Sequence, residues 1–230
     1  MKKICICGGG ALGHVAAGYI AARSKAEVRV LTNHPERWSR SISVHTPEGE
    51  SLIGSLSMIS SSAKDVVTGA DVLLFCLPGF LIKEELEKVK PYLGTDAYVG
   101  TVFSSTGFFF EALKILSPEQ PLWGFQRVPF ISRVVEYGHS ANLLGYKSGF
   151  NITVEHVSDV EKSQFADWVA DAFGRPVHLL RNYLEASLTN SNPILHTSRL
   201  YTLFSDWYEG VRYPSQFAFY DTWDVSSAQR

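Results

Sequence analysis

The sequence has no excess of charge of either sign. Its 21 lysines and arginines nearly balance 23 aspartates and glutamates, which gives a net charge of −2. A protein that binds nucleic acid, or that docks on an anionic membrane, gathers Lys and Arg on one surface. No such cluster occurs along this chain. We therefore expect neither nucleic acid nor a membrane among its partners.

Long hydrophobic runs are also missing. The longest apolar stretches, such as residues 71–78 (DVLLFCLP), are far shorter than the roughly 20 apolar residues that span a bilayer. The Met-Lys-Lys start resembles the charged region of a signal peptide, but glycines interrupt the next segment and residues 28–30 continue as a strand. We predict a cytoplasmic protein.

Cysteine is scarce. The three cysteines, Cys5, Cys7 and Cys76, all fall in predicted strands. No C-x-x-C pair and no Cys/His spacing typical of a metal site occurs in the sequence. We expect reduced thiols that act as small apolar side chains, and no bound metal.

The beginning of the chain is organised as strand, glycine turn, helix and strand. Residues 3–7 (KICIC) indicate a short buried strand, residues 11–24 an alanine-rich helix, and residues 27–31 (EVRVL) an alternating strand. This is the β-α-β unit of a parallel sheet. We predict an α/β fold with an N-terminal Rossmann doubly wound sheet. A hairpin is predicted at 41–56, further strands at 71–77, 97–103, 122–135, 141–147, 150–155 and 175–180, and further helices at 83–92, 107–116 and 159–173.

The composition changes near residue 181. There the β-branched clusters end, the patterns become helical, and aromatic residues become frequent. We predict a NAD(P)-binding domain over residues 1–181 and an all-helical substrate and dimerisation domain over residues 182–230. The second part, of about fifty residues, is too short for an independent core. We expect it to be incomplete and to pack on the first domain or on a second copy, which favours a homodimer.

The turn after the first strand is rich in glycine. Its sequence, GGGALG, fits the pattern G-x-G-x-x-G. In this pattern the first glycine allows a tight turn, the second lets the backbone approach a pyrophosphate, and the third lets helix and strand pack closely. The helix N-terminus then offers unpaired N–H groups to the phosphates. The predicted cofactor-binding residues of this loop are Gly8, Gly9, Gly10, Ala11, Leu12 and Gly13.

The end of the second strand selects the cofactor. An acidic residue there would bind the ribose 2′-hydroxyl of NAD, but residues 31–37 (LTNHPER) place no carboxylate at the strand end. Thr32 and Asn33 are suited to bond a 2′-phosphate, and His34 and Arg37 would add positive charge. We predict NADP as the favoured cofactor and NAD as the alternative. In the alternative, Arg37 only covers the following helix.

Two later turns belong to the same site by topology. Ligands of open parallel sheets bind beyond the carboxyl ends of the strands. Leu77 and Pro78 follow one such strand, and we expect them against the ribose and nicotinamide side of the cofactor. Ser104 and Ser105 follow the next strand near the reactive ring, where helix capping would explain them equally well.

Three other side chains carry relevant chemistry. Arg127 and Arg133 flank a predicted cleft strand, where either could hold a substrate carboxylate bidentately or form a surface ion pair. His14 lies in the first helical turn beside the phosphate loop, and we expect a structural role for it.

His196 stands at the start of the helical part. Pro193 suits the first turn of a helix, so His196 falls early on that helix and faces either the cleft or the core. Histidine titrates in the range that a proton donor to a carbonyl or imine requires. The residues alone support a catalytic and a structural role equally.

Three motifs together resemble the opine dehydrogenase family (octopine and nopaline dehydrogenases). They are the glycine turn at 8–13, N-P-x-x-H at 192–196, and F-Y-x-x-W-x at 219–224. The resemblance implies reductive condensation of a small α-keto acid with the amino group of an amino acid, with NAD(P)H as the hydride donor. It also implies that His196, with Asn192 of the same motif, is catalytic and that the histidine polarises the carbonyl and relays the proton.

The sequence departs from this family in three respects. Thr197 follows His196, where the family often has proline. The family's aspartate that assists the histidine lies farther along than residue 230, and the helical part is short. We therefore expect either a truncated form or a protein that binds cofactor without full catalysis. The carboxylates near His196 in this chain are Asp206, Glu209, Asp221 and Asp224.

Two alternatives stay open. A ketopantoate-reductase-like 2-keto acid reductase would share the Rossmann start, but that resemblance asks for a lysine at the start of the helical part. No lysine follows Lys162 in this sequence. The other alternative is a non-catalytic NADP-binding module, which would bind the cofactor and turn over no substrate.

Overall fold

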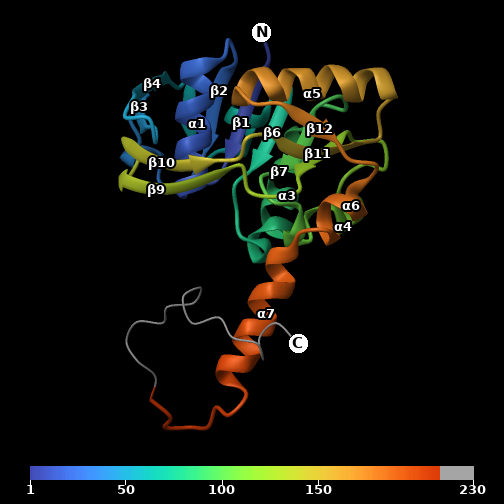
Figure 1. Ribbon diagram of the computed structural model, residues 1–230. Coiled ribbons are helices and arrows are strands. Elements are labelled where there is room, and N and C mark those ends of the chain that lie inside the picture. Colours follow the sequence, from blue (N-terminus) through green and yellow to red (C-terminus); the bar gives the residue numbers. More distant parts are fainter. Residues whose placement is uncertain (213–230) are drawn as a thin grey trace. The chain divides into compact units, whose positions relative to one another are not determined.

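The computed structural model describes residues 1–212 (Figure 1). The chain divides into two compact units, Met1–Leu188 and Thr189–Arg230. Within the described part of the second unit lies one long helix, α7 (Ser191–Phe204). The motif at 219–224, with Asp221 and Asp224, lies outside the described residues. Among residues 1–212, no helix is long and apolar enough to cross a membrane.

The main sheet of the first unit has eight strands in the order β12-β11-β8-β7-β6-β1-β2-β5. The segment from β8 to β5 is parallel throughout, and its strand order is that of the Rossmann sheet. The predicted fold class is confirmed. The strands are β1 (Lys3–Cys7), β2 (Glu27–Leu31), β5 (Met58–Ser60), β6 (Val72–Phe75), β7 (Tyr98–Thr101), β8 (Leu122–Phe125), β11 (Phe150–Glu155) and β12 (Val177–Leu179).

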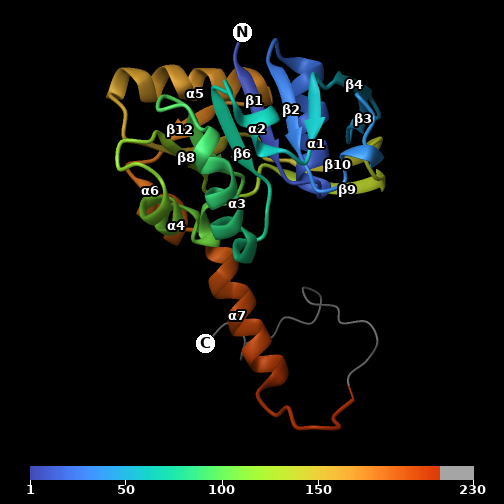
Figure 2. The ribbon, with the colours of Figure 1, turned by 180° about the vertical axis from the view of Figure 1, so that it is seen from behind.

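Helices cover both faces of this sheet (Figures 1 and 2). Successive side chains of a strand point to opposite faces. In β1, Ile4 and Ile6 join the core on the side of α1 and α5, whereas Cys5 and Cys7 join the core on the side of α2, α3 and α4. All three cysteines are buried and free, as expected. The helices are α1 (Ala11–Arg23), α2 (Ala63–Val67), α3 (Ile82–Val89), α4 (Phe108–Ile115), α5 (Asp159–Phe173) and α6 (Tyr183–Leu188).

A second, four-stranded sheet packs on the outer side of α1, with strand order β4-β3-β10-β9. The predicted hairpin forms β3 (Ser41–His45) and β4 (Ser51–Ser55). The prediction of one strand over 122–135 is wrong, because the chain leaves the main sheet after β8 and enters the second sheet as β9 (Phe130–Glu136). Pro129, which has no N–H for a sheet ladder, stands at this break. The remaining strand is β10 (Ser140–Tyr146).

Helix α6 packs with the first unit. It contacts β8, β11 and the 3₁₀ turn at Ser104–Thr106. Tyr183 stacks on Phe109 of α4, with 5.5 Å between ring centroids, and Ala186 is fully buried. The compact unit therefore continues to Leu188, past the boundary that the composition indicated at residue 181. The assignment of separate cofactor and substrate domains stays a prediction.

Candidate functional site

The loop between β1 and α1 forms the centre of the candidate site. Gly8 has a φ of 125°, which suits glycine and strains other residues. A Cβ at Gly13 would collide with the Gly8 carbonyl, so the absence of a side chain there lets α1 lie directly against the turn. At Gly10 a Cβ would face open space, with no atom of residues 1–212 within 4 Å. The backbone at Gly10 is therefore accessible to a ligand.

This open space lies at the N-terminus of α1. Gly10 is the N-cap residue, and it has no side chain to bond the first N–H groups of the helix. Those N–H groups have no partner within the helix, and the helix dipole places partial positive charge beside them. The predicted loop residues thus come together as a site suited to an anion.

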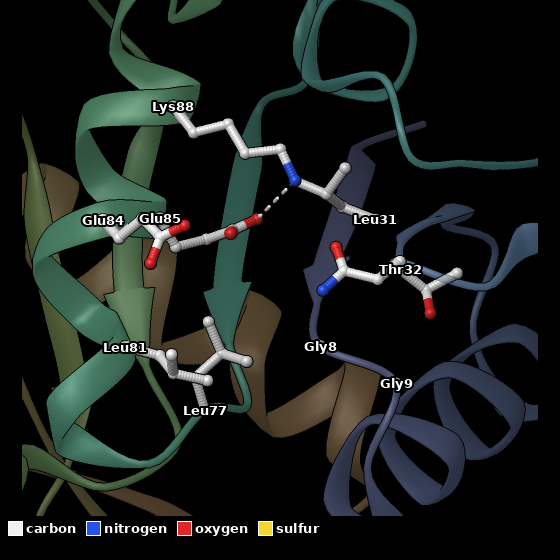
Figure 3. Close-up of a pocket in the computed structure, with 10 residues that line it drawn as sticks. Gly8, Gly9, Leu31, Thr32, Leu77, Leu81, Glu84, Glu85 and Lys88 are labelled. Atoms are coloured by element: carbon white, nitrogen blue, oxygen red, sulfur yellow. Dashed lines mark ion pairs between the residues drawn. The ribbon is translucent and has the colours of Figure 1, made fainter.

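A small cavity of about 130 Å³ lies between the glycine loop and α3 (Figure 3). It is beyond the carboxyl ends of β1, β2 and β6, where open α/β sheets bind ligands. Its walls come from the glycine loop, the end of β2, the segment after β6, and α3. The lining residues are Gly8, Gly9, Leu31, Thr32, Asn33, Leu77, Leu81, Glu84, Glu85 and Lys88.

Two charged side chains of α3 form a pair at this cavity. The Nζ atom of Lys88 is 3.6 Å from Oε1 of Glu85, and the Glu85 side chain is only 18% exposed. Burial raises the pKa of the Glu85 carboxyl, and the Lys88 ammonium acts in the opposite direction. Sequence reasoning missed both residues, because an i,i+3 pair on an amphipathic helix is typical of a solvated surface.

The residues after β2 differ in burial and in their distance from the small cavity. Thr32 is buried, and its Oγ1 accepts a hydrogen bond from the His34 N–H at 3.4 Å. Asn33 is exposed and lines the small cavity. The His34 ring lies 3.5 Å from the Glu36 carboxylate, and both side chains are exposed. Of the side chains predicted to bind a 2′-phosphate, Thr32 and Asn33 therefore lie at the cavity itself.

Arg37 is held by an aromatic residue from the second sheet. Its guanidinium lies over the ring of Tyr137, 4.5 Å from the centroid. The hydroxyl oxygen of Tyr137 is 3.3 Å from the Thr32 hydroxyl oxygen. Tyr137 lies in the turn between β9 and β10, so the second sheet contributes directly to the end of the candidate site at β2. The sequence does not indicate that Tyr137 belongs to the site, because its contact with Thr32 joins distant parts of the chain.

His14 fixes that turn to the glycine loop. Its Nε2 accepts a hydrogen bond from the Gly138 N–H at 2.6 Å, and its Nδ1 lies 2.9 Å from the Gly10 carbonyl. Because Nε2 is the acceptor, the proton of the neutral ring is on Nδ1 and is donated to Gly10. Burial lowers the pKa of His14, which favours this neutral form. The geometry is that of a structural histidine.

A larger, mostly apolar cleft of about 570 Å³ lies on the other side of the glycine loop. It shares Leu77 with the small cavity. Among the described residues that line it, Arg133 carries the charge. The lining residues are Gly10, Ala11, Leu12, Cys76, Leu77, Pro78, Val102, Phe103, Thr106, Val128, Phe130, Ile131, Ser132 and Arg133.

The hydroxyl groups of the two serines after β7 form hydrogen bonds to backbone carbonyls of the first unit. Ser104 is buried, and its Oγ donates to the Phe125 carbonyl at 2.7 Å. The Oγ of Ser105 donates to the Ser187 carbonyl at 2.8 Å. Thr106 is the residue of this turn that lines the large cleft. The serine hydroxyls therefore tie the turn to β8 and α6.

The two arginines that were predicted to bind substrate line different depressions of the surface. Arg133 lines the large cleft, and its Nη1 donates to the Ser132 carbonyl at 2.8 Å. Arg127 lines a different depression of about 400 Å³, together with Lys147. Of the two, only Arg133 is near the glycine loop.

The motif N-P-x-x-H lies in the first turns of helix α7. The side chain of the N-cap residue Asn190 accepts a hydrogen bond from the Asn192 N–H at 3.1 Å. Pro193 lies in the first turn, as predicted. His196 is half-buried and Asn192 is exposed. Both lie in the second unit, and their catalytic assignment stays a prediction that rests on the motif.

Known proteins resemble this chain over nearly all of its length. Octopine dehydrogenase from Mizuhopecten yessoensis is 27% identical, over 89% of this chain and 55% of that protein. Opine dehydrogenase from Haliotis discus hannai is 26% identical, over 99% of this chain and 61% of that protein. This chain thus spans less than two thirds of the length of these relatives. The family model for ketopantoate reductase PanE/ApbA matches residues 4–104.

Solved structures share the fold. Octopine dehydrogenase with NADH and L-arginine has a TM-score of 0.87 at 24% sequence identity, and the match covers 100% of this chain and 60% of that one. Octopine dehydrogenase with NADH and pyruvate has a TM-score of 0.86 at 24% identity, and the match covers 100% of this chain and 62% of that one.

Proposed function

We propose that this chain, which is a relative of the octopine and opine dehydrogenases, is an NAD(P)H-dependent oxidoreductase. The proposed reaction is the reductive condensation of an α-keto acid with the amino group of an amino acid. One observation carries the proposal: two cavities flank the glycine loop, whose backbone is open at Gly10. The narrow cavity lies toward β2, and the broad apolar one lies toward β7. A dinucleotide has the matching form, with two ring systems on either side of a pyrophosphate.

The residues present fit such a cofactor. The N–H groups at the start of α1 would hold the pyrophosphate, and the small cavity would take the adenosine end. Leu77 and Pro78 would contact the nicotinamide end in the large cleft. When bound, the reduced nicotinamide supplies the hydride.

We propose that the cofactor is NADP(H) in preference to NAD(H). The end of β2 carries Thr32 and Asn33 in place of a carboxylate. Arg37 lies nearby, already held over Tyr137. A guanidinium that is held in place loses less side-chain freedom when it binds a phosphate. These side chains support binding of a 2′-phosphate.

For the substrates, the proposal assigns Arg133, His196 and Asn192. Arg133 is suited to bind a substrate carboxylate at the large cleft, because a guanidinium can donate two parallel hydrogen bonds to it. His196, with Asn192 in the same motif, would polarise the carbonyl and relay a proton to the reacting group. The homodimer and the cytoplasmic location stay predictions from the sequence.

The proposal is tested first by binding and then by turnover. Fluorescence titrations with NADPH and with NADH should show binding of both, tighter for NADPH. Assays with pyruvate should then consume cofactor only when an amino acid is added. If neither dinucleotide binds, the proposal fails at its first step.

A second candidate is a 2-keto acid reductase of the ketopantoate reductase type. The match of that family model to residues 4–104 favours it. The two enzymes differ in the amine, because this reductase would consume cofactor with a keto acid alone. Cofactor binding without turnover of any keto acid, with or without an amine, would instead support the non-catalytic module.

A further inference from the structure

The small cavity beside the glycine loop has aliphatic side chains on two sides and charged side chains along one edge. Leu31, Leu77 and Leu81 supply aliphatic surface on either side. Three charged side chains of α3 line this charged edge in Figure 3, namely Glu84, Glu85 and Lys88. Glu85 and Lys88 form an ion pair there. This arrangement suits a flat heteroaromatic ring that carries hydrogen-bonding groups along one edge.

The charged edge offers an acceptor beside a donor. An ionised carboxylate only accepts hydrogen bonds and an ammonium only donates them. Adenine has the complementary order, because its 6-amino group donates and the neighbouring ring nitrogen accepts. Hypoxanthine has a carbonyl oxygen in place of the amino group, so its acceptor would face the Glu85 carboxylate.

We propose that Glu85 and Lys88 recognise the amino edge of the adenine base, which makes this cavity selective for adenine over 6-oxo purines. The inference rests on the proposed function, since it assigns the base end of the same cofactor. Glu85 accepts from the 6-amino group, and Lys88 donates to the adjacent ring nitrogen. Leu31 and Leu81 contact the faces of the base.

Partial burial makes this contact selective. The Glu85 and Lys88 side chains are 18% and 34% exposed, respectively. A carboxylate shielded in this way cannot easily replace a lost hydrogen bond with one to water, so a mismatched base loses the affinity that this contact supplies. We expect the hypoxanthine dinucleotide to bind about 10-fold to 100-fold more weakly than the adenine dinucleotide.

The test compares NADH with reduced nicotinamide hypoxanthine dinucleotide, which differs only at the 6-position of the base. Kd values are measured by fluorescence for the full chain and for two variants. In Glu85→Gln the amide both accepts and donates, so the affinity ratio between the two dinucleotides should fall close to one. In Glu87→Gln the ratio should be unchanged, because Glu87 pairs with Lys83 on the exposed side of the same helix.

Lys88→Gln is a third variant, which probes the other half of the pair. It should lower the affinity for NADH and reduce the ratio, because the ring nitrogen of adenine loses its charged donor. Circular dichroism shows which variants are folded, so that either half of the pair can be tested alone.

The outcomes distinguish a failure of adenine recognition from a failure of the proposed cofactor binding. Equal binding of the two dinucleotides by the unmodified chain would overturn the inference and leave the cofactor proposal standing. An unchanged ratio in a folded Glu85→Gln or Lys88→Gln would overturn it as well. If neither of these dinucleotides nor NADPH binds, both proposals fail.

Discussion

His14 and Gly138 are 124 positions apart in the chain, yet the Gly138 N–H donates to the His14 Nε2 at 2.6 Å. The same ring lies 2.9 Å from the Gly10 carbonyl through its other nitrogen. One imidazole thus holds the glycine loop to the turn that carries Tyr137. Protonation would break this arrangement, because an imidazolium cannot accept a hydrogen bond.

Stability should therefore fall on mild acidification. Burial lowers the pKa of His14 in the folded state below its ordinary value of 6.5. The unfolded chain then binds the proton more readily, so the stabilisation by neutral His14 is fully present above pH 6.5. It is lost as the pH falls below that value toward the lower pKa of the folded state.

Urea unfolding of the unmodified chain and of His14→Gln, at several pH values between about 5 and 8, measures this effect. The variant should lose part of the pH dependence. His139→Gln, at an exposed histidine in the same turn, is the matched control. An identical pH dependence in His14→Gln and the unmodified chain would contradict the assignment.

The glycines of the loop should respond differently to alanine. Gly13→Ala places a Cβ against the Gly8 carbonyl, so we expect a loss of about 1–3 kcal/mol in the free energy of unfolding. Gly10→Ala places its Cβ in open space and should fold normally. It should weaken dinucleotide binding, because the methyl group occupies the approach of the pyrophosphate. Thermal melting and fluorescence titration distinguish the two effects, and normal cofactor affinity in Gly10→Ala would argue against this pyrophosphate position.

Arg37 and Tyr137 should control cofactor choice. Arg37→Met removes a charge that would bind the 2′-phosphate, so NADPH affinity should fall about tenfold while NADH affinity is unchanged. Tyr137→Leu should act in the same direction, because it removes the ring over which Arg37 lies. Arg40→Met, at another exposed arginine close by, is the control. A parallel loss of NADPH and NADH affinity in Arg37→Met would assign a general electrostatic role instead.

Substitution of the two arginines predicted to bind substrate should have different effects on KM. Arg133 lines the large cleft and Arg127 does not belong to its described lining. Arg133→Met should raise the KM for the keto acid or the amino acid by about tenfold or more, since a carboxylate loses its charged partner. Arg127→Met should leave KM unchanged. Similar kinetics for the two variants would remove Arg133 from the substrate site.

His196 can be tested apart from cofactor binding. If it is the proton donor, His196→Asn should abolish turnover and leave the Kd for NADPH nearly unchanged, because both cavities proposed to hold the dinucleotide are lined by the first unit. His178→Asn, at an exposed histidine of that unit, should retain full activity. Turnover by His196→Asn at the rate of the unmodified chain would rule out the catalytic role.

Features that depend on neighbouring residues could be predicted from the sequence. The glycine loop is one of them, since the turn, the helix start and the close packing all lie within residues 8–13. Tyr137 could not be predicted, because its contact with Thr32 spans 105 positions. The second sheet was missed for the same reason: β10 pairs with the distant β3. Glu85 was missed because a helical pattern does not show which of its charged residues lines a cavity.

The position of α1 between two sheets has a further consequence. Every residue from Gly13 to Ile20 is buried, since one side of the helix faces β1 and β2 and the other faces β3, β4 and β9. The middle of this helix therefore has no solvent-facing positions at which substitutions are tolerated. Over evolution, its middle residues could change only together with those of one sheet or the other. The segment that would present the proposed pyrophosphate site should therefore be among the slowest of the chain to diverge.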